Sequence, residues 1–209
     1  QSWASGYASP DLGSVMVSIS PGPEQNLELE HQIPHETAHV LLYQSTGTGY
    51  SKLPTWLVEG VASISELYAN PDYQRTLEIA SDNHTLIPIT DLCQPFPREA
   101  SGAFLAYAES SSFTRFLYKN YGTTGLQSLV DQYMNGLGCS EAVQAAFGIP
   151  LAQLDRQWQA QNLNINTNRI ALMNFVPYIF LLVVLAAATL LIPLLLKRFR
   201  TPGTGRKQV

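Results

Sequence analysis

Two histidines with the spacing of metal ligands occur in the run His35-Glu36-Thr37-Ala38-His39. If this run is helical, the two imidazoles lie one turn apart on one face, with about 5–6 Å between their Cβ atoms, and can share one tetrahedral Zn²⁺. Glu36 points off the shared axis, so its carboxylate can accept a proton from a water that the ion acidifies. The spacing indicates a metal-dependent hydrolase in which one coordination position stays open for water.

Glu59 is the candidate for a third ligand. It stands within a second amphipathic segment, residues 54–68, which we expect to form a helix that ends near Ala69. The positions that this pattern would bury are Trp56, Leu57, Val61, Ile64 and Leu67. A carboxylate in the middle of such a pattern needs a partner, and a metal ion would be one.

The two segments together resemble a known family. His35-Glu-Thr-Ala-His39, followed by Pro54-x-Trp-Leu-x-Glu59-Gly60-x-Ala62, is similar to the gluzincin zinc peptidases, in particular their bacterial peptidase-MA-like branch. The resemblance implies that His35, His39 and Glu59 bind one Zn²⁺. It also implies that Glu36 is the general base of a peptidase acting on peptide or protein substrates.

The likeness continues downstream, and it covers roughly residues 13–160. Residues 107–122 and 145–158 are similar to the helical C-terminal part of that branch. Tyr107 resembles the family's tyrosine at the start of its downstream helix, whose phenol could stabilise the oxyanion formed during hydrolysis. The alternative is a tyrosine that only packs its helix. His84, in an irregular loop, is the other candidate donor, although a lone loop histidine is usually just solvated.

The predicted fold is α+β and mainly helical: a gluzincin-like zinc peptidase domain at residues 13–161 with a reduced N-terminal sheet. Residues 1–12 are expected to be a flexible lead-in, and only residues 14–20 read as a convincing strand before the first histidine. Pro34 requires that the active helix begin there or kink. Further helices are expected at about residues 72–79, 103–121, 126–134, 140–147 and 151–161.

Several residues near the ligands have supporting roles to fill. Ser63 and Glu66 could orient a ligand histidine, although solvent-facing positions fit equally well. Gly60 is expected to permit close approach of the two helices, and Trp56 to pack in the core. We expect His31 to be a surface residue, because a proline separates it from the ligand run.

Cys93 and Cys139 are the only cysteines, and they do not have metal-ligand spacing. In an exported domain an even pair favours a disulfide, which the chain-entropy model values at about 4 kcal/mol for a loop of this size. The alternative is two unrelated buried thiols.

A long apolar segment follows the domain. Residues 170–196 contain no Asp, Glu, Lys, Arg or His, and at about 1.5 Å per residue a helix of this length crosses a hydrocarbon core of about 30 Å. We expect a transmembrane helix, the alternative being a buried core helix. Asparagine-rich residues 162–169 would form a polar tether, and residues 197–209 a basic tail.

Charge sets the expected orientation and excludes one class of partner. Five basic residues follow the apolar segment, so the positive-inside rule places the tail in the cytoplasm and the domain outside a cell membrane crossed once. The part before Leu196 holds all 16 acidic residues and seven basic ones, a net charge of −9. Such an acidic domain gives no support for nucleic-acid binding.

Two other interpretations share these residues. One is a metal-stabilised binding or scaffold domain that no longer cleaves anything, for which Glu36 has no chemical use. The other is a fragment of a larger exported protease, since the chain starts at Gln1 without a visible export signal. The sequence leaves the substrate specificity and the oligomeric state open.

Overall fold

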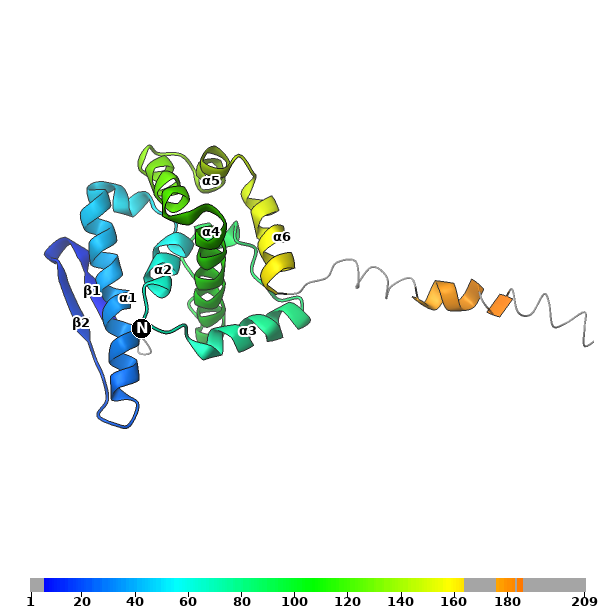
Figure 1. Ribbon diagram of the computed structural model, residues 1–209, viewed down its shortest axis with the longest axis horizontal. Coiled ribbons are helices and arrows are strands. Elements are labelled where there is room, and N and C mark those ends of the chain that lie inside the picture. Colours follow the sequence, from blue (N-terminus) through cyan, green and yellow to red (C-terminus); the bar gives the residue numbers. More distant parts are fainter. Residues whose placement is uncertain (1–5, 164–175, 183, 186–209) are drawn as a thin grey trace, which may run out of the picture. The chain divides into compact units, whose positions relative to one another are not determined.

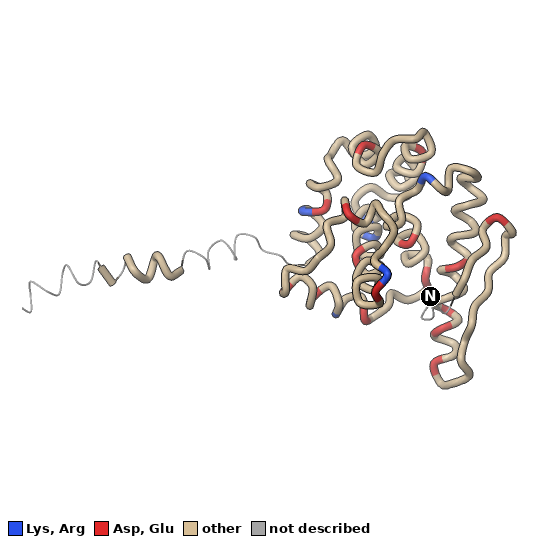
Figure 2. Tube along the Cα trace, turned by 180° about the vertical axis from the view of Figure 1, so that it is seen from behind, with Lys and Arg blue, Asp and Glu red and all other residues tan. Residues whose placement is uncertain are grey.

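The computed structural model describes residues 6–163, 176–182 and 184–185. It separates into two units, residues 1–165 and residues 166–209. The first unit is mainly helical with a small sheet, which agrees with the predicted α+β class (Figure 1; seen from behind in Figure 2).

The second unit is described only in part. Residues 176–182 and 184–185 are helical, and most of the predicted span 170–196 lies outside the described residues. The predicted tail at residues 197–209 lies wholly outside them, as does the predicted tether from residue 164 onward. Within the described part of the chain, no helix has both the length and the apolar character needed to cross a membrane.

The elements of the first unit begin with a hairpin and continue as helices. The strands are β1 (Gly6–Ser9) and β2 (Ser14–Val17), and the 3₁₀ turns are η1 (Pro10–Leu12), η2 (Gly47–Lys52) and η3 (Asp91–Cys93). The helices are α1 (Gln25–Thr46), α2 (Thr55–Ile64), α3 (Pro71–Asp82), α4 (Ala100–Met134), α5 (Cys139–Phe147) and α6 (Leu151–Asn162).

The hairpin lies against α1 at one side of the helical body (Figure 1). β1 and β2 pair antiparallel with Tyr7 opposite Met16, and Gly13 takes the left-handed conformation, φ 62°, that leads into β2. The expected flexible lead-in at residues 1–12 was therefore wrong from Gly6 onward. A strand of only four residues is too short to show an alternating sequence pattern. β1 is instead defined by its pairing with β2 and its packing on α1.

Pro34 lies inside α1, so of the two alternatives expected from the sequence, a helix that begins at this proline or one that kinks there, the first is excluded. A proline has no N–H and cannot donate to the carbonyl four residues earlier, which is that of Glu30. That carbonyl instead accepts the N–H of Leu67 at 3.5 Å. The carbonyl that Pro34 leaves without a helical partner thus links α1 to Leu67, in the segment that follows α2 and directly after Glu66.

Helix α4 forms the centre of the body, and α2 packs against it (Figure 1). A Cβ at Gly60 would overlap Thr114 Oγ1 and lie 2.7 Å from the carbonyl oxygen of Ser110. Gly60 does permit close helix approach, but its partner is α4. Trp56 is fully buried, with its ring edge-on to that of Phe113 at 5.2 Å between centroids, as expected of a core residue.

The loop between α3 and α4 is fixed at three points. Cys93 and Cys139 form a disulfide that ties η3 to the start of α5, which confirms the predicted bridge. Glu109 Oε1 accepts the N–H of Ile87 at 2.9 Å, and Asp155 Oδ2 accepts that of Ile89 at 3.2 Å. Burial raises the pKa of Glu109 to about 8. These two acidic side chains accept hydrogen bonds from backbone N–H groups of the loop that would otherwise be without a hydrogen-bond partner.

Candidate metal centre

Helix α1 presents His35 and His39 on one face, one turn apart. Their ring centroids are 5.1 Å apart, and both side chains line a cavity of about 490 Å³. The cavity is bordered by β1, η1, α1, η2, α2, the start of α3 and the first two turns of α4. Its lining residues are Gly6, Tyr7, Ala8, Pro10, His31, Gln32, His35, Glu36, His39, Tyr50, Glu59, Asn70, Tyr73, Phe104 and Tyr107.

Glu59 reaches the same point from α2. Its Oε2 lies 3.5 Å from His35 Nε2 and 3.6 Å from His39 Nε2, and the three ligand atoms all lie within 4.8 Å of one another. Two imidazole nitrogens and one carboxylate oxygen are the donor set that catalytic zinc takes, with a fourth position left to water or substrate. The residues present therefore fit one Zn²⁺.

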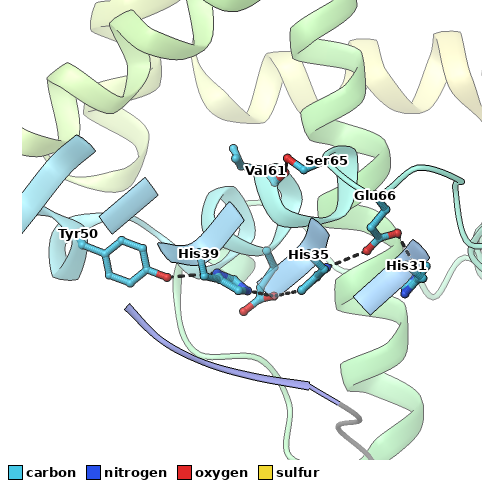
Figure 3. Close-up of polar contacts among 8 residues, drawn as sticks. His31, His35, His39, Tyr50, Val61, Ser65 and Glu66 are labelled. Carbon is cyan, nitrogen blue, oxygen red and sulfur yellow. Dashed lines mark hydrogen bonds and ion pairs between the residues drawn. The ribbon is translucent and has the colours of Figure 1, made fainter. Parts of the chain in front are cut away.

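The ring nitrogens that face away from this point have partners of their own (Figure 3). Glu66 Oε1 lies 2.7 Å from His35 Nδ1, as the orienting role expected of Glu66 requires, and its Oε2 lies 2.9 Å from His31 Nε2. On the other side, Tyr50 Oη lies 3.2 Å from His39 Nδ1. Because each Nδ1 is engaged outward, each Nε2 is free to point at the metal position.

His31 was wrongly expected to be a surface residue. Continuous helix through the proline places it one turn before His35, where its side chain is only 24% exposed and contacts the buried Glu66 carboxylate. Ser63, the other candidate for orienting a ligand, is buried, but its hydroxyl makes no hydrogen bond to His35 or His39. Glu66 is thus the one of the two that reaches a ligand histidine.

The carboxylates make the centre favourable for a cation. Burial lowers the pKa of His35, but hydrogen bonds and charge from Glu59 and Glu66 outweigh it and raise the value to about 9. For His39 burial prevails, and its pKa falls below the ordinary value. The negative charge that holds a proton on His35 would equally attract a divalent ion, which must displace that proton to bind.

Glu36 lies beside the ligands and beneath β1. Its side chain is buried, and burial raises its pKa although the charge of His35 opposes this shift. A Cβ at Gly6 would overlap the Glu36 carboxylate, with its Cδ and Cγ at 2.8 Å. A larger residue at position 6 would have to push the Glu36 carboxylate aside, so β1 limits where that carboxylate can lie. This role of Gly6 was not predicted from the sequence.

The two predicted oxyanion donors are placed differently. Tyr107 lines the cavity from α4, with its ring edge-on to that of Phe96 at 5.1 Å between centroids. His84 is exposed beyond the end of α3 with a left-handed φ of 55°, and it does not line the cavity. The structure gives no support to His84 as a donor. Tyr50 and Tyr73 also line the cavity, and the sequence analysis named neither.

Comparison with known families bears on the same residues. A family model of the Peptidase MA superfamily matches residues 1–164. The chain belongs to the Peptidase MA superfamily. The match extends the resemblance found in the sequence to both ends of the first unit, and it includes β1, which the sequence analysis had left out of the domain. The comparisons with curated proteins and with solved structures found no match.

Membership of the Peptidase MA superfamily agrees with the geometry of the centre. The family implies a metallopeptidase-like domain, a metal that is typically zinc, and peptide or protein substrates. The cluster of His35, His39 and Glu59 is where such a metal fits within the described part of the chain.

Proposed function

We propose that this chain is a zinc-dependent metallopeptidase that hydrolyses peptide bonds. The convergence of His35 Nε2, His39 Nε2 and Glu59 Oε2 beside the buried Glu36 carries the proposal. These are the groups that metal-assisted hydrolysis needs, and they come from two helices within one cavity.

The positions of the side chains indicate which step of peptide hydrolysis each group would serve. Zn²⁺, when bound, would polarise the scissile carbonyl and acidify the attacking water. The Glu36 carboxylate takes the proton from that water and later delivers it to the leaving amine. Its raised pKa suits both steps, because a base whose pKa lies nearer to neutrality also returns the proton more readily. His35, His39 and Glu59 hold the ion and do not exchange protons with the substrate.

Tyr107 is our candidate for stabilising the oxyanion. It lines the same cavity, and burial raises the pKa of its phenol, so that the hydroxyl keeps its proton at neutral pH and can donate a hydrogen bond. A donor placed where negative charge develops lowers the barrier of acyl transfer.

Removal of the metal tests the proposed reaction. The full chain should cleave a mixed peptide library, lose this activity on treatment with a zinc chelator, and regain it when zinc is restored in slight excess. Cleavage that continues undiminished in the chelator would exclude zinc from the reaction.

We also propose that residues 170–196 anchor the enzyme in a cell membrane, with the domain outside and the tail at 197–209 in the cytoplasm. The support is the uncharged apolar segment and the basic residues that follow it. In sealed right-side-out vesicles, external protease should digest the domain and spare an epitope at the C-terminus. Digestion of that epitope in intact vesicles would contradict this orientation.

A further inference from the structure

Tyr50 contacts the one ring nitrogen of His39 that the metal position does not use. Its Oη lies 3.2 Å from His39 Nδ1 (Figure 3). On the other side of the ring, His39 Nε2 lies 3.6 Å from Glu59 Oε2. This contact mirrors the contact of Glu66 with His35, with a phenol in place of a carboxylate. Each ligand histidine therefore has an outward partner, Tyr50 from η2 and Glu66 from the segment that follows α2.

The turn that carries Tyr50 is fastened to another helix. η2 follows α1 directly, and Lys52 Nζ donates to the carbonyl of Met134, at the end of α4, at 2.7 Å. A Cβ at Gly49 would lie 3.0 Å from the Met134 side chain, so the turn also packs closely there. The ring of Tyr43 lies edge-on to that of Tyr50, with 5.6 Å between centroids. These contacts hold the phenol in place independently of any metal.

We propose that Tyr50 is a positioning residue that accepts a hydrogen bond from His39 Nδ1–H and thereby directs the Nε2 lone pair at zinc. A neutral imidazole carries one N–H, so fixing the proton on Nδ1 leaves Nε2 as the donor to the metal. The hydrogen bond also fixes the rotation of the imidazole ring about its Cβ–Cγ bond. This inference rests on the proposed zinc site.

The kind of partner matters as well as its position. Tyr50 offers His39 a phenol oxygen, whereas Glu66 offers His35 a carboxylate. A neutral acceptor polarises an imidazole less than a carboxylate does. His39, whose partner is a phenol, receives no added negative charge from that partner. His35, whose partner is the Glu66 carboxylate, is the more electron-rich of the two ligands.

The test is zinc affinity in Tyr50→Phe, which removes one oxygen and keeps the ring. We expect zinc affinity to fall by about tenfold and zinc dissociation to accelerate, because loss of such an outer partner typically costs that much. The melting temperature of the metal-free chain should not change. The visible spectrum of the cobalt-substituted chain should change, since it reports the ligand geometry.

The matched control is Tyr43→Phe, which removes the hydroxyl from the neighbouring ring and leaves the contact with His39 intact. It should retain wild-type affinity and the wild-type cobalt spectrum. Wild-type zinc affinity in Tyr50→Phe, with a lower kcat, would overturn the inference and make Tyr50 a group that acts on the substrate. Equal losses in both variants, accompanied by lower melting temperatures, would overturn it in favour of packing. A wild-type chain that binds no zinc would instead overturn the zinc site itself.

Discussion

Replacing Glu36 with glutamine is expected to lower peptide hydrolysis by about 10³-fold or more while zinc stays bound. The amide has nearly the shape of the carboxylate but cannot accept the proton of the attacking water, and general-base catalysis typically contributes 10²–10⁴-fold. The metal is retained because Glu36 is not one of the three converging ligands. Turnover on a peptide substrate and zinc content should be measured on the same preparation.

The control for this variant is Glu30→Gln on the same helix, where the side chain is exposed and the charge change is the same. It should keep both activity and zinc. Undiminished turnover in Glu36→Gln would contradict the assignment of the base. A wild-type chain that binds zinc but cleaves none of a broad peptide library would favour the scaffold interpretation.

Removing the imidazole of His39 is expected to eliminate both zinc binding and activity. His39→Ala deletes one of the three donors, leaving His35 and Glu59 alone, so affinity should fall by more than the roughly 10–100-fold that an outer partner costs. The remaining pair cannot complete a tetrahedral site. Zinc content after dialysis and cleavage of the same substrate measure the two losses.

His84→Ala is the matched control for His39→Ala, because His84 is exposed and lies away from the cavity. It should retain zinc and activity in full. Stoichiometric zinc in His39→Ala would mean that the ion is held elsewhere.

The ligands could be predicted because their spacing is local and their chemistry is specific. His35 and His39 need only a helix to share a face, and Glu59 stood out as a charge within an apolar helical pattern. Helical periodicity likewise located the later helices to within a few residues. Residues 103–121 and 126–134 correspond to the two halves of α4, which meet where Gly122 leaves the helical conformation with φ 66°.

The errors arose where tertiary contacts decide local structure. α2 ends at Ile64, before the expected Ala69, and Leu67 is 64% exposed instead of buried. Its N–H bonds to Glu30 of α1, a contact created by Pro34 that no periodic pattern reveals. The same proline had been expected either to start the helix or to kink it, and His31, which precedes it, was therefore predicted to be a surface residue.

Tyr50 and Gly6 were missed for a related reason. Each belongs to an element of only a few residues, η2 and β1, and such elements carry no hydrophobic period. Gly6 matters because its missing side chain leaves room for Glu36, and Tyr50 because a turn fastened to α4 brings it back to the helix that precedes it. Sequence spacing cannot show either approach, since both depend on the packing of distant segments.

Zinc K-edge X-ray absorption on the zinc-loaded full chain tests the central claim most directly. We predict one zinc per chain, with two imidazole nitrogens at about 2.0–2.1 Å and only oxygen donors in the remaining positions. A spectrum with sulfur ligands or with fewer than two imidazoles would contradict the centre formed by His35, His39 and Glu59.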